Sequence, residues 1–319
     1  MVRQLASLLG AIVLVAACTR NEGQVAQTRA EGSTGGADGT QTEAAGSPEA
    51  GIAGRVVFDA DWDIYVANAD GSGLKRLTTS PAREFDPSWS PEGAKIAYRY
   101  EPGDDASAEI YVMGADGSEK TNLTRSPGQD HSPAWSPDGT KIAFASTRGG
   151  VLPHLWVMNT DGSSQTRLTA VSGEYPAWSP DGTQLAFDVN TDLEPTIDHG
   201  ARAGFDIFVV RADGSGLRRL TRAAGNDQGA SWSPDGRRIV FESDRGRSPG
   251  STTLWTMKAD GSMEKPLTSR DGFRPTWSRD DANILFSARG LFVVRADGSG
   301  LRALPIRAPG EIGLADWTG

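Results

Sequence analysis

One phrase recurs along this chain and restricts its fold more than any other feature. It stands as SPAWSPDGTKIAFAS at 132–146, YPAWSPDGTQLAFDV at 175–189 and GASWSPDGRRIVFES at 229–243. Looser copies keep the same order, so that each unit is marked by one tryptophan: Trp89, Trp135, Trp178, Trp232, Trp277 and Trp317. These tryptophans lie 40–54 residues apart, a period that is typical of four-stranded propeller blades.

Each unit holds four short segments of strand-forming residues. Around Trp135 the first segment ends at the tryptophan, and KIAFAS (141–146), HLWVM (154–158) and RLT (167–169) follow. A Ser-Pro-Asp-Gly turn separates the first two segments, because proline presets φ and glycine accepts a positive φ. Asp-Gly-Ser, a strong hairpin signal, separates the third from the fourth in all six units. The pattern predicts four antiparallel strands in each unit.

The two ends of the repeat region complement each other. The first unit begins at RVVFDA (55–60) and lacks a first strand, whereas the chain closes with LADWTG (314–319), a lone first strand. Pairing these two ends closes a ring and removes the open sheet edges. We therefore predict an all-β, six-bladed propeller over residues 52–319, closed by the C-terminal strand joining the N-terminal blade.

The N-terminal region differs from the repeats. Residues 1–17 have the basic start, short apolar run and small closing residues of a signal peptide. Val15-Ala16-Ala17-Cys18 resembles a bacterial lipobox, in which Cys18 carries the lipid; a plain secretion signal is the alternative. Residues 18–51 are small and polar, which predicts a flexible linker after the lipidated cysteine. We expect an anchored protein on the extracytoplasmic side of the envelope, periplasmic or at the cell surface.

The recurring phrases WSPDG, IAF, IYVM and LT resemble the WD40-like PD40 repeats of the TolB propeller family, over about residues 54–319. The resemblance implies a non-catalytic module of the cell envelope that binds or scaffolds a protein or peptide. It implies no cofactor, a monomer, and membrane contact through the lipid anchor alone. A net charge of −9 and a pI near 5.0 argue against nucleic acid as a partner.

The residues just before each tryptophan are expected to ring the mouth of the central channel. They are Glu84, Phe85, Asp86, Asp130, His131, Glu174, Tyr175, Asp227, Gln228, Phe273 and Arg274. They lie on the face that carries the variable loops, where binding residues collect on a rigid scaffold. The set is mostly acidic, which suits a cationic segment, a peptide end or a metal ion. The alternative is a set of solvated loop residues around a water-filled channel.

Histidines on this face leave a second function open. His131, His154 and His199 fall in different loops, as do the metal-binding histidines of propeller lyases, although no compact motif joins them. They are candidate ligands for a metal-assisted polysaccharide lyase or hydrolase; a small-ligand or ion sensor is a third alternative. Asp59, Asp61 and Asp63 mimic the start of a calcium loop, but Ile64 replaces the required glycine, which favours two strand ends and a turn.

Overall fold

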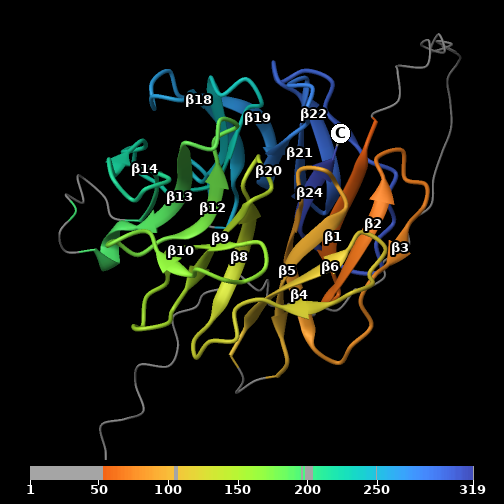
Figure 1. The fold of residues 1–319 in the computed structure, drawn as a ribbon. Coiled ribbons are helices and arrows are strands. Elements are labelled where there is room, and N and C mark those ends of the chain that lie inside the picture. Colours follow the sequence, from red (N-terminus) through yellow and green to blue (C-terminus); the bar gives the residue numbers. More distant parts are fainter. Residues whose placement is uncertain (1–52, 104–106, 195–196, 198–203, 249, 319) are drawn as a thin grey trace, which may run out of the picture. The chain divides into compact units, whose positions relative to one another are not determined.

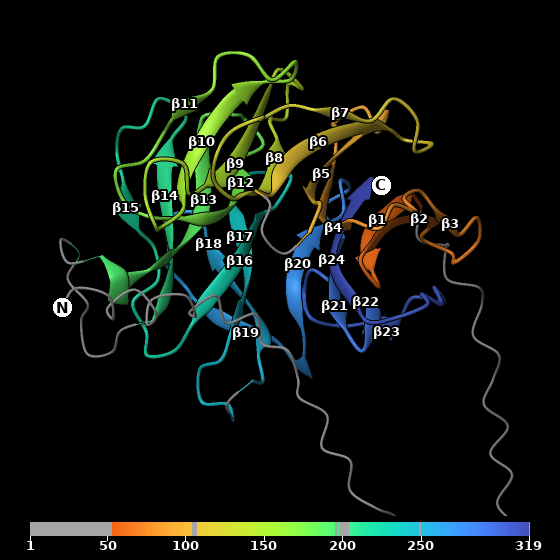
Figure 2. The same cartoon turned by 90° about the horizontal axis from the view of Figure 1, so that it is seen from below.

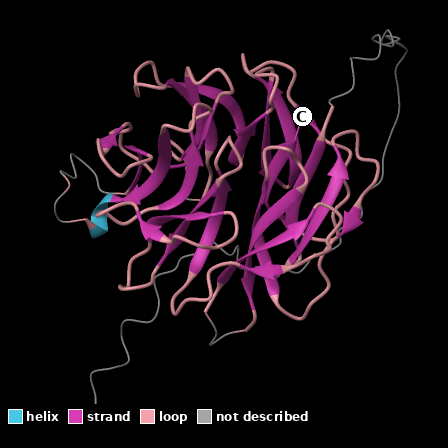
Figure 3. Cartoon of the chain, in the orientation of Figure 1, coloured by secondary structure: helices cyan, strands magenta, loops and turns pink. Residues whose placement is uncertain are grey.

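The computed structural model describes residues 53–103, 107–194, 197, 204–248 and 250–318, and every structural statement below concerns them. The signal peptide, Cys18, the linker and His199 lie outside the described residues. Within them, 24 strands form six four-stranded antiparallel sheets, which we name blades A to F. The sheets surround a common centre (Figures 1 and 2), and a three-residue 3-10 helix is the one helical element of this part (Figure 3). The six-bladed propeller predicted from the repeats is confirmed.

The strands follow the chain in simple order. Blade A comprises β24 (Ile312–Thr318), β1 (Arg55–Ala60), β2 (Asp63–Asn68) and β3 (Lys75–Arg76). Blade B comprises β4 (Arg83–Trp89), β5 (Lys95–Glu101), β6 (Glu109–Gly114) and β7 (Thr121–Asn122). Blade C comprises β8 (Asp130–Trp135), β9 (Lys141–Ser146), β10 (His154–Asn159) and β11 (Thr166–Arg167). Blade D comprises β12 (Glu174–Trp178), β13 (Gln184–Asn190), β14 (Phe205–Arg211) and β15 (Arg218–Arg219). Blade E comprises β16 (Asp227–Trp232), β17 (Arg238–Ser243), β18 (Thr253–Lys258) and β19 (Lys265–Asp271). Blade F comprises β20 (Phe273–Trp277), β21 (Asn283–Ala288), β22 (Gly290–Arg295) and β23 (Arg302–Ala303).

The two ends of the repeat region pair with each other and close the ring, as their sequences predict. β24 pairs antiparallel with β1, so that Thr318 faces Arg55 and Ala315 faces Phe58. In Figures 1 and 2 the blue C-terminal strand lies beside the orange N-terminal strands. Blade A is therefore built from both ends of the repeat region.

The first strand of each blade is the inner edge of its sheet and lies next to the channel. Proline stands two residues before the tryptophan in four of these strands, as Pro87, Pro133, Pro176 and Pro275. A proline has no N–H to donate, so it is tolerated where a strand edge has no partner strand. The prolines thus mark the channel-facing edge.

Aromatic rings fill the blades. The fourth residue of each second strand is fully buried, as Phe58, Tyr98, Phe144, Phe187, Phe241 and Phe286. Five of the six repeat tryptophans are buried between blades, and Trp178 is half-buried. Burial of such rings is the main favourable contribution that each repeat makes to the core.

The Leu-Thr phrase has a specific role at the outer strands. The threonine hydroxyl accepts an N–H near the start of the third strand of its blade, as in Ile64 to Thr78 (2.9 Å) and Ile207 to Thr221 (3.0 Å). The same bond recurs at Thr124, Thr169 and Thr268. The outer strands are shorter than predicted, since β3 ends at Arg76 and this side-chain bond continues the pairing. β19, with seven residues, is the exception.

Asp59, Asp61 and Asp63 form strand ends and a turn, as the favoured alternative predicted. Asp59 is the last but one residue of β1, Asp63 begins β2, and Asp61 and Trp62 make a two-residue turn with positive φ at both positions. The carboxylate of Asp63 accepts hydrogen bonds from Arg76 (2.5 Å) and from the hydroxyl of Thr78. In the described part of the chain, no helix has the length and apolarity needed to cross a bilayer.

Candidate functional site

A bulge interrupts each inner strand just before its tryptophan. The pairing register shifts there in all six blades, as between His131 and Ala134 in β8. In five blades the residue three places before the tryptophan has a left-handed backbone: Asp86 (φ 51), Ser132 (φ 53), Tyr175 (φ 51), Gly229 (φ 63) and Arg274 (φ 54). This conformation is uncommon for bulky side chains, and bulges of this kind re-aim a side chain. Here they turn that residue toward the axis.

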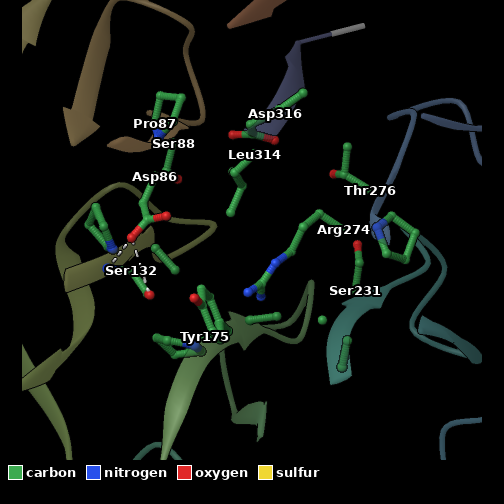
Figure 4. Close-up of a pocket in the computed structure, with 18 residues that line it drawn as sticks. Asp86, Pro87, Ser88, Ser132, Tyr175, Ser231, Arg274, Thr276, Leu314 and Asp316 are labelled. Atoms are coloured by element: carbon green, nitrogen blue, oxygen red, sulfur yellow. Dashed lines mark hydrogen bonds between the residues drawn. The ribbon is translucent and has the colours of Figure 1, made fainter. Parts of the chain in front are cut away.

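These bulges line a central cavity. Its wall takes three residues from each inner strand, those one, two and three places before the tryptophan, and its volume is about 170 Å³. Figure 4 shows Asp86, Ser132, Tyr175, Arg274 and Leu314 around it. The six-fold repeat therefore supplies the shape of the cavity, and the residue at the bulge supplies its chemistry.

Carboxylates satisfy the backbone N–H groups that the bulges release from the sheets. Asp188 accepts the N–H of Gly229 at 3.1 and 2.9 Å, and Asp59 accepts that of Leu314 at 3.0 Å. Asp86 accepts the N–H of Ser132 at 3.2 Å, and Glu242 accepts that of Arg274. An unpaired buried N–H group lowers the stability of the folded state, so the first role of these carboxylates is to stabilise the fold.

Arg274 crosses the cavity. Its guanidinium carbon lies 3.3 Å from the centre of the Tyr175 ring, although a whole blade separates their strands. That intervening blade contributes Gly229, where a Cβ would approach Arg274 Cδ to 3.7 Å and Glu242 Oε1 to 3.3 Å. The absence of a side chain at Gly229 leaves the path free. In Figure 4 Arg274 extends from its strand toward Tyr175.

The guanidinium is not fully satisfied. Arg274 Nη1 is buried and has no hydrogen-bond partner among the described residues. Burial lowers the pKa of Arg274, but Tyr175, Glu242, Asp188 and Asp86 outweigh it and raise the pKa above its usual value. The group stays charged and offers a buried N–H donor to any oxygen acceptor that enters the cavity.

Burial and charge also perturb the neighbours of Arg274. The guanidinium lowers the pKa of Tyr175, but burial and the surrounding acids raise it to about 12, so the phenol stays protonated. Burial, with Arg99 and Arg274, lowers the pKa of His131 to about 4 despite Asp86, which keeps the imidazole neutral at pH 7. The ring of His131 lies 6.4 Å from that of Tyr175.

Two of the carboxyl groups that cap N–H groups at the bulges have strongly raised pKa values. Burial, followed by the charge of Asp86, raises the pKa of Asp59 to about 7. Burial raises the pKa of Asp188 well above its usual value, although Arg274 opposes the shift. The negative charge around the cavity is therefore smaller than a count of acids indicates.

The structure sorts the eleven predicted mouth residues into three levels. Asp86, Tyr175 and Arg274 line the cavity. Phe85, His131, Glu174, Gln228 and Phe273, one residue earlier, are half-buried. Glu84, Asp130 and Asp227, another residue earlier, are buried and lie outside the cavity lining. Successive side chains of a strand point to opposite faces, which separates the second level from the third, and the bulge turns the first level toward the axis.

The three buried acids are engaged within their blades. Asp130 pairs with Arg148 at 2.6 Å, and Asp227 pairs with Arg245, which also contacts Glu264. Glu84 accepts the hydroxyl of Ser80 at 2.5 Å. Arg148 and Arg245 lie over Trp156 and Trp255, at 4.8 and 4.9 Å from the ring centres. These contacts fix the inner strands on which the predicted mouth residues lie.

The histidines do not come together as a metal site among the described residues. His131 Nδ1 lies 3.0 Å from the hydroxyl of Ser132, and His154 Nδ1 lies 3.0 Å from the carbonyl of Leu152. The described side chains include no group of three or more histidine, cysteine or acidic residues that could hold a metal ion.

Sequence reasoning missed the bulges, the path of Arg274, the acids Asp188 and Glu242, and the role of Asp59 as an acceptor at a bulge. Two signals pointed to the bulges: the prolines at the inner edge, and Asp, Ser or Gly at three of the six bulge positions, residues that tolerate positive φ. No sequence signal indicates that Arg274 reaches Tyr175 across Gly229, because those residues lie 45 or more positions apart.

The chain is similar to known propeller proteins in sequence and in fold. The model of the PD40 family, "TolB beta propeller domain", matches residues 101–197 and 172–298, which together cover more than half of the chain. The Tol-Pal system protein TolB of Zymomonas mobilis is 41% identical over 75 residues, 23% of this chain and 16% of that protein. TolB of Rhizorhabdus wittichii is 39% identical over 75 residues, 23% of this chain and 17% of that protein. The chain thus spans only a small part of these relatives.

Solved structures show the fold alone. TolB from Acinetobacter baumannii superposes with a TM-score of 0.68 at 21% identity, covering 83% of this chain and 66% of that one. Hydrazine synthase of Kuenenia stuttgartiensis gives the same TM-score at 16% identity, covering 84% and 47%. The architecture alone therefore does not separate binding modules from enzymes.

Proposed function

This chain belongs to the TolB β-propeller domain family, and from that membership we propose that it is a non-catalytic protein- or peptide-binding module of the cell envelope. Its partner contacts the channel mouth and inserts one side chain or chain end into the central cavity. The two TolB relatives are Tol-Pal system proteins by name, which supports a protein partner in the envelope.

The observation that carries this proposal is the unsatisfied arginine in a narrow cavity. Arg274 Nη1 is buried without an acceptor among the described residues, so a ligand that brings a carbonyl or carboxylate oxygen gains a charge-assisted hydrogen bond. The cavity, at about 170 Å³, is smaller than the roughly 300–1,000 Å³ of small-molecule sites. Its size suits one side chain or a peptide end better than a polysaccharide.

The proposed contact set follows the levels that the structure distinguishes. The residues that reach the partner are Phe85, Asp86, His131, Glu174, Tyr175, Gln228, Phe273 and Arg274. Glu84, Asp130 and Asp227 support the mouth from inside the blades, since each is buried and engaged. The mouth therefore offers both signs of charge, with Arg274 in the centre and acids around it.

A pull-down from native envelope with the full chain as bait tests this proposal. The variant carrying Arg274→Gln and Asp86→Asn is expected to lose a partner that the unchanged bait captures. The matched control carries Arg237→Gln and Asp235→Asn, the same two changes in an exposed turn on the opposite face, and retains the partner. A partner captured equally by both variants would remove the mouth from the proposal.

We also propose that Cys18 carries the lipid that holds the protein on the extracytoplasmic side of a membrane. The support is Val15-Ala16-Ala17-Cys18 at the end of the apolar run, together with Cys18 being the chain's one cysteine. Bacteria grown with labelled palmitate are expected to label the unchanged chain and the Thr19→Ser control, and not Cys18→Ser. Labelling of Cys18→Ser would contradict the anchor.

A further inference from the structure

A second surface, on the face that carries the turns between the first and second strands of each blade, lies between blades C and D. A groove of about 490 Å³ opens there between the turn at 136–140 and the turn at 180–182. Its apolar lining includes Val157, Trp178 and Ala212, and its charged residues are Asp138, Asp181 and Lys141. This groove is separate from the central cavity, and the two share no lining residue.

Two other blade boundaries show what fills the equivalent space. The second strand of blade A begins with Arg55, whose guanidinium lies 4.6 Å from the centre of the Trp89 ring in blade B. Arg238 begins the second strand of blade E and lies 4.5 Å from the Trp277 ring of blade F. Each arginine thus covers the repeat tryptophan of the following blade.

Each of these arginines also reaches the turn between the first and second strands of the following blade. Arg55 donates to the carbonyl of Gly93 at 2.6 Å, and Arg238 pairs with Asp281 at 3.0 Å. Under them Trp89 and Trp277 are only 4% and 5% exposed. The arginine therefore closes the boundary by stacking and by hydrogen bonding together.

The boundary between blades C and D lacks this arginine, as do the boundaries after blades B, D and F, but at those three the repeat tryptophan is buried. Lys141 stands at the equivalent first position of β9, and its ammonium donates to Asn159 of its own blade at 2.6 Å. Trp178 is half-buried, and its indole N–H donates to the carbonyl of Ala134 at 3.1 Å. Gly182 lines the groove at the turn position that Gly93 and Asp281 occupy elsewhere.

We propose that this groove binds an arginine side chain of a polypeptide partner, stacked on Trp178 between the two turns. The guanidinium would take the place that Arg55 and Arg238 take at their own boundaries. Asp138 and Asp181 give the groove two carboxylates against one ammonium, which favours a cation. A planar guanidinium suits the site better than a compact ammonium, because it stacks and donates in one plane.

Fluorine NMR of the full chain labelled with 5-fluorotryptophan tests the groove, with the Trp178 signal assigned from Trp178→Phe. The probe is the blocked peptide acetyl-Gly-Arg-Gly-amide. We expect a saturable shift of the Trp178 signal, and binding of the matching lysine peptide at least about fivefold weaker. No shift, or equal binding of the two peptides, would overturn the proposal.

Three variants test whether the shift of the Trp178 signal arises from binding in this groove. Lys141→Arg supplies the missing side chain from within the chain and is expected to abolish the peptide-induced shift, with the other tryptophan signals unmoved. Lys95→Arg makes the same change at the equivalent position of blade B and leaves the shift intact. Lys141→Met keeps the groove open and retains binding. An undiminished shift in Lys141→Arg, or its loss in Lys141→Met, would contradict the proposed site.

Discussion

A carboxyl group beside the channel can complete the hydrogen bonding of a bulge at a place where burial disfavours its ionised form. Asp59 accepts the N–H of Leu314 and so completes the hydrogen bonding of a bulge, but it lies almost out of reach of water, at 8% exposure. Burial penalises its ionised form, and Asp86 adds a like charge. The pKa of Asp59 is consequently about 7 in the folded protein, against 3.8 ordinarily.

This shift makes stability depend on pH in a definite direction. Between pH 4 and pH 7 the unfolded chain has lost the Asp59 proton that the folded chain still holds, so the free energy of unfolding falls as pH rises. Asp59→Asn cannot ionise and keeps an oxygen acceptor for Leu314. We expect it to match the parent near pH 4 and to exceed it above pH 7 by up to about 4 kcal/mol in urea unfolding.

Asp70→Asn is the matched control for that measurement. Asp70 lies in an exposed turn, where hydrogen bonds from Ser72 lower the pKa of its carboxyl. Its replacement is therefore expected not to reproduce the gain in stability above pH 7. Parallel stability curves of Asp59→Asn and the parent at all pH values would show that Asp59 titrates normally.

At the scale of the strand, side chains complete what the backbone leaves unpaired. The outer strands are mostly two residues long, and a threonine hydroxyl then accepts the next N–H of the third strand. In blade D, Thr221 accepts from Ile207 and donates to the buried Asp206 at 3.2 Å. In blade F the corresponding residue is Pro305, so this bond is absent from that blade.

We therefore expect Thr221→Val to leave a buried N–H and a carboxylate oxygen without their partner, at similar side-chain volume. The expected loss is about 1–3 kcal/mol in the free energy of unfolding, measured with urea. Thr121→Val changes an exposed outer-strand threonine and is expected to stay within about 0.5 kcal/mol of the parent. Equal losses in the two variants would mean that the hydroxyl bond contributes nothing specific.

At the scale of the whole propeller, the closing strand joins residues more than 250 positions apart. β24 pairs with β1 and also lies next to β4, where Asp316 accepts the N–H of Trp89 at 2.7 Å. Ile312 and Trp317 of this strand are buried in the core of blade A. Its loss would expose the edge of β1, to which it is hydrogen-bonded.

Deletion of residues 312–319 is expected to open the ring and to lower the free energy of unfolding by at least about 3 kcal/mol, since Trp317 alone is a buried large ring. Urea unfolding followed by circular dichroism gives the midpoint. Glu311→Gln, an exposed change just before the strand, leaves that midpoint unchanged. A truncated chain with the parent's midpoint would show that closure does not stabilise the propeller.

The sequence by itself determined the number of blades, their strand order, their turns and the closure of the ring. These features follow from local signals, because alternation, Ser-Pro-Asp-Gly and Asp-Gly-Ser act within a few residues and recur in each unit. The sequence also predicts that the segment before each tryptophan rings the channel mouth; three residues of that segment, Asp86, Tyr175 and Arg274, line the central cavity.

Only the tertiary structure decided what those residues do. Asp130 and Asp227 turn into their blades because strand alternation and the partners Arg148 and Arg245 place them there. Arg274 reaches Tyr175 because the intervening blade presents Gly229 at the same height. Such contacts join different repeats across the axis, and no local pattern encodes which side chain meets which until the ring has closed.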